Sequence, residues 1–389
     1  MRIGLELPPQ QRVYGGFFIY SFCMGSLPPR LGDIQHAMGI EEGALGFGLI
    51  GAAAGTLISL SLAGPLLERV GYRRAILMLI PLLSLGYAIS VLATGPLAFF
   101  LLLLPVGLVI GGIEIILNLE ADRTEHMIGH RIMNRAHAFW SFGFFSSGIA
   151  SAAIAQTGLD FRVHLFLMVP VVVAGVALLL GRFDPAPHRT GGSTDETKGF
   201  ATPTLAIMIL VVVTLSAMIM EGAGIDWSAI YMRDEFAVTP FVAGFAVALG
   251  AFTQAATRFF ADPFVERYSP TVVSRVLLGV LGIGAVLVFF ATADWMALLG
   301  FGLMGVGTSV IFPLAMSAAA QRTDRPAATN VASLAQTSFV AFLLGPPLLG
   351  YIAEHFGIRW SFGLGIPLVV LSLIFADALG RKPLRHEVD

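Results

Sequence analysis

The sequence predicts an all-α integral membrane protein with twelve transmembrane helices in two pseudo-symmetric six-helix halves. Three observations predict this fold: charge is scarce, apolar segments are long, and the two halves of the chain resemble each other. Of the 389 residues, 56% are hydrophobic and 12% are charged, whereas a soluble domain carries about 25% charged residues. This composition excludes a soluble enzyme, and the net charge of −2 excludes a nucleic-acid-binding protein, which needs a basic surface.

Twelve apolar segments of about 20 residues are separated by breaks rich in charge, proline and glycine. A segment of this length crosses a bilayer as a helix because lipid offers no partner to open backbone groups. The segments are continuously apolar, which also excludes the strands of a β-barrel, because apolar and polar residues alternate along such strands. The first segment is expected to remain in the mature protein, since the preceding residues lack the features of a signal peptide. The predicted spans are 13–33, 44–66, 74–94, 97–119, 134–155, 161–181, 203–226, 239–260, 271–292, 295–318, 327–352 and 359–380.

Basic residues are distributed unevenly between the two sides of this predicted bundle. Nineteen of the 23 lysines and arginines fall on the side of the termini. Because basic loops stay in the cytoplasm, both termini are predicted to be cytoplasmic. The four basic residues on the other side are Arg30, Arg162, Arg233 and Arg359.

A polar segment divides the chain almost equally. Residues 183–202 are rich in Pro, Gly, Ser and Thr, a composition typical of a flexible linker. We therefore predict an N-terminal half (1–182, spans 1–6), a cytoplasmic linker (183–202) and a C-terminal half (203–389, spans 7–12).

The halves share identities at an offset of 198 residues. Two six-helix halves related by a repeat are typical of secondary transporters, which hold their substrate near the midplane between the halves. The matches are Gly46 and Phe47 with Gly244 and Phe245, and Pro65, Glu68 and Arg69 with Pro263, Glu266 and Arg267.

A charged motif follows the second span in each half. The first comprises Gly64, Glu68, Arg69, Gly71, Arg73 and Arg74, and the second comprises Arg258, Asp262, Glu266 and Arg267. The first resembles the cytoplasmic motif G-x-x-x-D-R-x-G-R-R of the major facilitator superfamily, with Glu68 in place of the aspartate and Tyr72 in place of a basic residue. The segments PRLGDIQ, AHAFWSFG, GIDWSAIYMRDE and FLLGPPLLGYIAE resemble a bacterial inner-membrane branch with fucose-permease-like relatives.

The resemblance implies a transporter of the inner membrane. It also implies that the charged motifs act as gates, because charges at cytoplasmic helix ends can pair with opposing helix ends when that side closes. Breaking such pairs would shift the population of inward and outward states. The alternative, simple positive-inside topology, explains the arginines of the motifs but not their repeated acids.

Ionisable side chains within the spans indicate function because they are costly at bilayer depth. Glu114 is the sharpest case, with Asn118 one turn further on. Desolvation favours the protonated form of a carboxylate, so Glu114 is a candidate proton-coupling residue, and the resemblance places a protonatable acid in this span. The alternative is that Glu114 reaches water at the cytoplasmic end or pairs with Arg123.

The seventh span contains a second acid, Glu221. No basic residue adjoins it in the sequence, so we expect it to bind a cationic or hydroxyl-rich substrate or to be a second proton site. The following Asp226 and Trp227 are predicted to cap a helix end and to anchor in the head-group region, in preference to contacting substrate.

Polar groups in other spans are candidates for the substrate cavity. His137 and Ser141 lie one turn apart beside Trp140, and an aromatic face near hydrogen-bonding groups suits a sugar ring. The alternative for His137 is a structural hydrogen bond near the cytoplasmic surface. Buried amides need partners, so Gln254, Asn330 and Gln336 either line a wet cavity or join helices.

These features predict a secondary active transporter that moves a small polar solute by alternating access, coupled to protons. A sugar or sugar derivative is favoured by the resemblance, and the direction is expected to be uptake. Exporters of drugs or metabolites, and a non-transporting receptor or scaffold on the same fold, are the alternatives. There is no phosphate-binding G-x-x-x-x-G-K-[ST] motif and no metal-ligand spacing, so we predict no cofactor, no metal and no enzymatic activity. The predicted partners are the solute, protons and lipid, and a monomer suffices because one chain contains both halves.

Overall fold

The computed structural model describes residues 4–130, 132–187 and 201–380, and every regular element in these ranges is a helix. Eleven helical segments there are long and apolar enough to cross a membrane. The first predicted span forms α1 (Pro9–Met24), which has 16 residues. An all-helical membrane fold is therefore confirmed, and the number of twelve spans stays a prediction.

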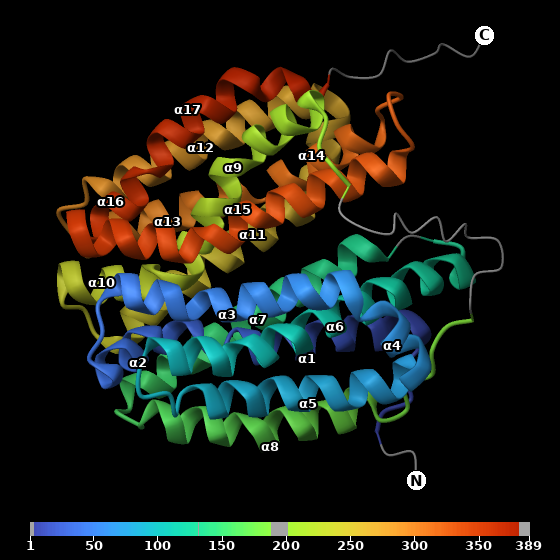
Figure 1. The fold of residues 1–389 in the computed structure, drawn as a ribbon, viewed down its shortest axis with the longest axis horizontal. Coiled ribbons are helices and arrows are strands. Elements are labelled where there is room, and N and C mark those ends of the chain that lie inside the picture. Colours follow the sequence, from blue (N-terminus) through green and yellow to red (C-terminus); the bar gives the residue numbers. More distant parts are fainter. Residues whose placement is uncertain (1–3, 131, 188–200, 381–389) are drawn as a thin grey trace.

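The helices form two bundles, which lie one above the other in Figure 1. The lower bundle contains α1, the 3-10 helix η1 (Pro28–Arg30), α2 (Leu31–Met38), α3 (Glu42–Leu62), α4 (Gly64–Val70), α5 (Tyr72–Ser90), α6 (Pro96–Ile128), α7 (Met133–Gln156) and α8 (Phe161–Leu180).

The upper bundle follows in the same chain order. It contains α9 (Leu205–Asp226), α10 (Ser228–Phe236), α11 (Pro240–Tyr268), α12 (Pro270–Phe289), α13 (Asp294–Thr308), α14 (Ile311–Ala320), α15 (Ala327–Phe356), α16 (Ile358–Gly363), α17 (Gly365–Phe375) and η2 (Ala376–Leu379). Most of the predicted linker lies outside the described residues, so its predicted boundaries stay a prediction.

The predicted limits of spans 1, 4 and 8 differ clearly from the observed helices; span 8 was predicted at 239–260, whereas α11 continues to Tyr268. The prediction placed span 1 at 13–33, but α1 ends at Met24 and the chain turns through Pro28 and Pro29. Proline lacks the backbone N–H that a continuing helix needs. The prediction ended span 4 at residue 119, whereas α6 continues to Ile128 and ends at the left-handed Gly129, because its polar last turns still form helical hydrogen bonds beyond the apolar segment.

Helix starts repeat at the offset that the sequence identities show. The pairs are α3 at Glu42 with α11 at Pro240, α5 at Tyr72 with α12 at Pro270, and α6 at Pro96 with α13 at Asp294.

The backbone of the turns repeats at the same spacing. Gly39 has a φ of 62° and Ala237, 198 residues later, has a φ of 49°. Gly71 and Ser269 correspond in the same way, with φ values of 83° and 108°. Positive φ is costly for a residue with a Cβ. The second bundle therefore keeps the turn geometry of the first after losing the glycine that favours it.

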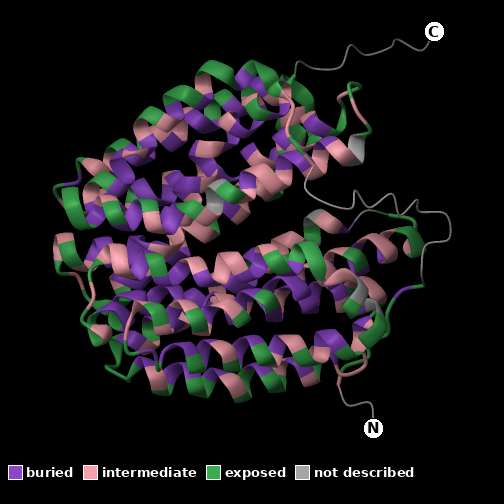
Figure 2. Cartoon of the chain, viewed as in Figure 1, coloured by how far each residue is buried: buried purple, intermediate pink, exposed green. Residues whose placement is uncertain are grey.

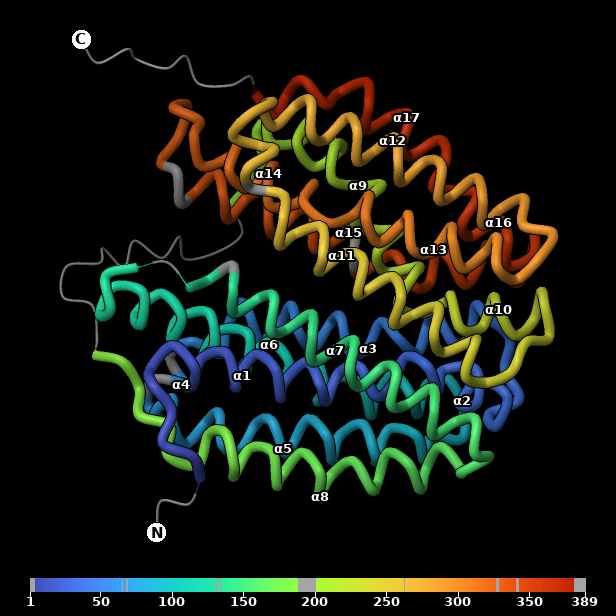
Figure 3. The backbone as a smooth tube through the Cα atoms, turned by 180° about the vertical axis from the view of Figure 1, so that it is seen from behind, coloured from blue at the N-terminus to red at the C-terminus, as the bar shows by residue number. Residues whose placement is uncertain are grey.

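The bundles contact each other mainly through α3 with α15 and α7 with α11, and to a smaller extent through α10 with α2 and through η1 with α10 and α11. Hydrogen bonds between the bundles lie near α2 and α10, at the end opposite the termini (Figures 1 and 3). They join Gly43 N to Glu354 Oε2 (3.1 Å), Phe241 N to Gln156 Oε1 (3.1 Å) and Arg233 Nη2 to Gln35 Oε1 (3.4 Å). Towards the termini the two bundles diverge (Figure 3).

Burial follows the helix faces that the bundles share. Residues on the inner faces are mostly buried, while exposed residues follow the outer faces (Figure 2). Many of these exposed residues are large and apolar, such as Leu101, Leu178 and Ile283. Apolar side chains on an outer face are stable against lipid tails, so this pattern agrees with a membrane-embedded bundle.

Candidate substrate cavity

A cavity of about 560 Å³ lies between the two bundles. Residues of α1, α3, α5, α6 and α7 line it from one bundle, and residues of α9 and α15 line it from the other. Most of its wall is apolar, so its few polar groups determine what it can hold. The side chains with polar atoms in this wall are Tyr20, Thr56, Tyr87, Glu114, Asn118, Trp140, Glu221 and Asp226.

Glu114 is held by two neutral donors. The Tyr20 hydroxyl donates to Glu114 Oε1 at 2.9 Å, and Asn118 Nδ2 donates to Oε2 at 3.1 Å. Asn118 also donates to the backbone carbonyl of Glu114 at 2.9 Å, as a residue one helical turn away can. The structure therefore places Glu114 at the cavity, and the alternative of a pair with Arg123 is wrong. Arg123 instead lies over the Tyr72 ring and 3.8 Å from Glu120.

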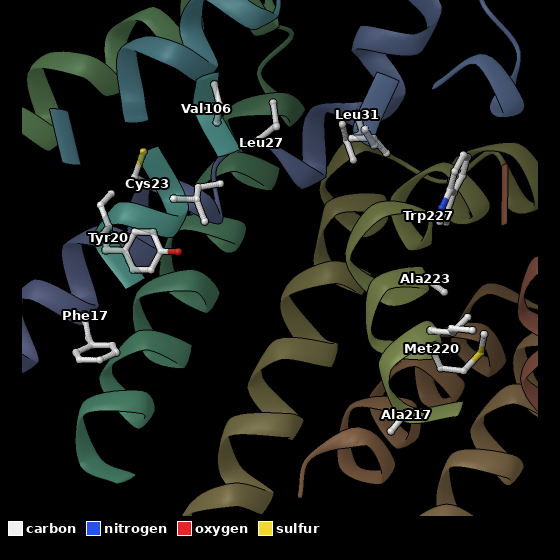
Figure 4. Packing of buried hydrophobic residues seen from close by; sticks show 14 of the residues in the cluster. Phe17, Tyr20, Cys23, Leu27, Leu31, Val106, Ala217, Met220, Ala223 and Trp227 are labelled. Carbon is white, nitrogen blue, oxygen red and sulfur yellow. The ribbon is translucent and has the colours of Figure 1, made fainter. Parts of the chain in front are cut away.

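Tyr20 is a site residue that the sequence analysis missed. It is 1% exposed and comes from α1, whereas Glu114 comes from α6. Its hydroxyl points away from its own helix, toward the side on which α9 lies in the view of Figure 4. A tyrosine within an apolar span is a sequence signal, because a buried phenol needs a partner. The sequence does not tell which span supplies that partner.

Glu221 has a cation beside it, contrary to the expectation from its sequence neighbours. Arg258 Nη2 lies 3.8 Å from Glu221 Oε1, and Arg258 Nε donates to the Ser309 carbonyl at 2.6 Å. The statement that nothing local neutralises Glu221 is therefore wrong. The sequence places the two residues 37 positions apart, and only the packing of α9 against α11 brings them together.

Asp226 and Trp227 occupy other positions than those predicted. Trp227 is 0% exposed, so it packs inside the protein and does not anchor in the head-group region. Its ring faces Gly350 of α15, where an added Cβ would approach the indole to 3.1 Å. Asp226 ends α9 as predicted, but its side chain lines the cavity. For Asp226, the preference for a structural role over substrate contact therefore stays a prediction.

An aromatic wall extends the cavity towards the C-terminal bundle. The rings of Trp140 and Phe144 stack at 5.5 Å between centroids. Both rings also line a small recess of about 40 Å³ with Glu221 and Gln254. Gln254 donates to the Thr308 hydroxyl at 3.2 Å, so its amide both joins two helices and borders the recess.

Four predicted cavity residues lie elsewhere in the bundles. His137 contacts the Phe17 ring at 5.0 Å, and Ser141 donates to the His137 carbonyl and borders a separate recess between α7 and α11. Asn330 donates to Asp324 at 3.0 Å, outside the cavity. Gln336 accepts from the Ala201 backbone at 2.9 Å. In the described structure these side chains join segments of the protein and do not line the cavity.

The charged motif after α3 contacts its own bundle. Arg73 donates to the carbonyls of Gly181 and Phe183 at 2.8 and 2.9 Å. Its Gly71 takes the positive φ that separates α4 from α5. The side chains of Glu68 and Asp262 lie outside the described residues. The predicted gate role therefore stays a prediction for Gly64, Glu68, Arg69, Gly71, Arg73, Arg258, Asp262, Glu266 and Arg267.

The fold and the cavity define a class of protein. Two helical bundles that share an internal cavity, with ionisable groups facing it, are the arrangement of a membrane transporter. A family model described as "Major Facilitator Superfamily" matches residues 209–387. An uncharacterized MFS-type transporter of Yersinia pestis is 27% identical over 371 residues, covering 94% of each chain. An uncharacterized transporter of Sinorhizobium fredii is 28% identical, covering 96% of this chain and 98% of the relative.

The chain therefore resembles the major facilitator superfamily, and the two relatives are named as transporters. Solved structures share the fold. The nucleoside transporter NupG superposes with a TM-score of 0.72 at 13% identity, over 96% of this chain and 98% of that one. A D-xylose–proton symporter gives 0.71 at 14%, over 94% and 97%. The Escherichia coli fucose:proton symporter gives 0.62 at 15%, over 96% and 98%.

Proposed function

We propose that this protein is a proton-coupled secondary transporter that takes up a small polar solute, with a sugar or sugar derivative favoured. The observation that carries the proposal is the Tyr20–Glu114–Asn118 cluster at the cavity between the two bundles. The cluster contains a carboxylate that can gain and lose a proton. It also lies where a solute would contact it.

Glu114 is suited to proton transfer because its neighbours are neutral. Two donors hold its carboxylate oxygens, but no cation among the described residues forms an ion pair with it. Desolvation in the apolar wall opposes the charged form of the carboxylate, while the two hydrogen bonds support it. Binding of a solute can then change which form is favoured.

The wall of the cavity suits a ring that carries hydroxyl groups. Trp140 and Phe144 offer an aromatic face, and the oxygens of Glu114, Glu221 and Asp226 offer hydrogen-bond acceptors. Two of the solved structures with this fold are named as sugar–proton symporters and a third as a nucleoside transporter. Their low identity supports the proposal only through the fold.

Transport would proceed by alternating access. The hydrogen bonds between the bundles gather at the end near α2 and α10, and the bundles diverge towards the termini (Figure 1). With the termini in the cytoplasm, as the basic residues predict, this conformation faces inward. We assign the protein to the bacterial inner membrane on the same grounds, and as a monomer because one chain supplies both walls.

Purified protein in proteoliposomes tests the proposal. A panel of radiolabelled hexoses, pentoses, hexosamines and nucleosides is offered with and without an inward proton gradient. We expect one class to accumulate only with the gradient, and Glu114→Gln to abolish accumulation while exchange of solute across the membrane continues. Equal accumulation by the variant would refute the proton role of Glu114. Accumulation that ignores the gradient in the wild type would refute proton coupling.

The apolar wall supports a second candidate, an exporter of drugs or metabolites. Leu49, Leu103, Ile110 and Phe339 would accept an apolar ligand. Cells that lack an exporter would be more sensitive to a toxic compound, and the proton gradient would drive solute into inside-out vesicles. Growth of a deletion strain on a panel of antibiotics and dyes separates this candidate from uptake.

A further inference from the structure

The three acids of the cavity differ in what neutralises them. Glu221 has Arg258 at 3.8 Å, and Glu114 has the two neutral donors Tyr20 and Asn118. Asp226 has neither a hydrogen bond nor an ion pair in the described part of the chain, although it lines the same cavity. An ionised carboxylate away from bulk water and without a partner is costly, so Asp226 is the acid whose partner the protein itself does not supply.

The basic residues at the same end of the bundles are already engaged. Asp226 is the last residue of α9, at the end where α2 and α10 lie. Ion pairs hold the arginines of that end with acids other than Asp226. The pairs are Arg30 with Asp33 (2.9 Å), Arg233 with Asp234 (2.7 Å) and Arg359 with Glu235 (2.6 Å).

The cavity wall is rich in acceptors and poor in free donors. The Tyr20 hydroxyl and the Asn118 amide donate to Glu114, and the Thr56 hydroxyl donates to the carbonyls of Ala52 and Gly107. The exceptions are the indole N–H of Trp140, which is buried without a partner, and the hydroxyl of Tyr87, which lines the same wall and interacts electrostatically with Asp226. An ionised carboxylate only accepts hydrogen bonds, whereas an ammonium group only donates them. A solute that carries an ammonium group therefore matches this wall, and a solute that carries a carboxylate does not.

The surroundings of Asp226 strengthen that match. Leu27, Pro28 and Leu31 line the cavity at the turn from α1 to α2, near the end of α9. Leu31 and Trp227 lie towards each other across this region in Figure 4. An ion pair that forms among such apolar groups is screened far less than one in water. An aromatic face such as that of Trp140 also attracts cations.

From these contacts we infer that Asp226 selects solutes carrying an ammonium group, so that the transported solute is an amine-bearing polar molecule, such as an amino sugar, and not a sugar acid. The inference rests on the proposed function in one respect, that this cavity is the substrate site. It differs from the proton role, because Glu114 and Asp226 lie on different bundles and have different neighbours.

Ligand-induced thermal stabilisation of the purified full-length protein in detergent tests the inference at pH 7. Two matched sets of probes differ only in charge: glucosamine, glucose and glucuronate, and ethanolamine, ethylene glycol and glycolate. A ligand that binds only the folded state raises its apparent melting temperature. We expect the amine of a set to stabilise the wild type more than its neutral and anionic counterparts.

Variants of the protein then test whether Asp226 is the residue that binds the amine. Asp226→Asn is expected to weaken amine binding roughly 30-fold or more, the loss typical of truncating one partner of a desolvated charge pair. Asp226→Glu keeps the charge and should retain measurable amine binding. Asp377→Asn removes the same charge from a surface pair with Arg275 and should bind the amine like the wild type.

Several results would overturn the inference. They are equal or greater stabilisation by the neutral or anionic probes, no stabilisation by either amine, and unchanged amine binding in Asp226→Asn. If Asp226→Asn does not fold, the probe series on the wild type and the Asp226→Glu variant still test the inference. The measurement uses no proton gradient, so it stands independently of the Glu114→Gln flux experiment. Amine binding without any transport in proteoliposomes would refute the proposed function and leave the role of Asp226 in binding intact.

Discussion

The two bundles share one plan of helices but stabilise their acids differently. In the N-terminal bundle, Glu114 lies between a phenol and an amide. In the C-terminal bundle, Glu221 faces a guanidinium group, and Asp226 faces the cavity alone. Neutral donors therefore hold Glu114, whereas a cation lies beside Glu221. The comparison teaches that helix positions repeat between the two bundles, while different side chains set the chemistry of each bundle.

The largest expected effect comes from the charge pair of the C-terminal bundle. Arg258→Gln leaves Glu221 without its cation in a partly buried place, which is more costly than removing both charges. We expect a loss of uptake of about tenfold, equivalent to 1.4 kcal/mol, measured as initial uptake rate in proteoliposomes.

The double variant Glu221→Gln/Arg258→Gln is the matched control. Both variants lose the hydrogen bond from Arg258 to the Ser309 carbonyl, so only the orphaned charge distinguishes them. The double variant should recover most of the lost rate. Equal activity of the single and double variants would show that the pair does not set the charge of Glu221.

A smaller effect is expected from the phenol of the N-terminal bundle. Tyr20→Phe removes the 2.9 Å hydrogen bond to Glu114 but leaves the carboxylate in place. Because one hydrogen bond contributes about 0.5–1.5 kcal/mol net, proton-driven uptake should fall about 2- to 10-fold.

Tyr14→Phe serves as the control on the same helix. Tyr14 stacks on Phe139 with ring centroids 4.9 Å apart and is not part of the cavity wall. The Tyr14→Phe protein should therefore transport solute like the wild type. A Tyr20→Phe protein as active as Tyr14→Phe would mean that the phenol does not tune Glu114.

The smallest effect tests the repeat through its turns. Ala237→Gly should raise stability by about 1 kcal/mol, because glycine adopts the positive φ of this turn without strain. Gly39→Ala should lower stability by a similar amount, and a Cβ at Gly39 meets nothing within 4 Å, so only the backbone is affected. Thermal unfolding in detergent measures both changes. Shifts of the same sign in the two variants would contradict the equivalence of these turns.

Much of the fold could be predicted because it depends on one-dimensional signals. Apolar length predicted the helices, and the offset of 198 residues predicted pairs of helices whose starts repeat at that spacing. The predicted helix ends were wrong where amino-acid composition was the only signal. The apolar stretch around Pro28 continues past the end of α1, and the polar end of α6 continues a helix past its apolar part. Backbone hydrogen bonding decides such limits, and hydropathy does not.

The candidate site was only partly predictable. Glu114, Asn118, Trp140, Glu221 and Gln254 were found as polar or aromatic groups within spans, and the structure places all of them at the cavity or its side recess. His137, Ser141, Asn330 and Gln336 carried the same signal but bond within or between segments elsewhere. Polarity within a span indicates that a partner exists, and it does not tell whether that partner is protein or ligand.

The sequence by itself determined that this protein is a helical membrane transporter of two related halves. The scarcity of charge, the apolar length and the repeat are properties of the chain that the bilayer and the backbone convert directly into spanning helices. Only the tertiary structure decided which acid has a partner. Tyr20 meets Glu114 across 94 residues and Arg258 meets Glu221 across 37, while Asp226 meets none in the described chain, because ion pairing depends on distances of a few ångströms that helix packing sets.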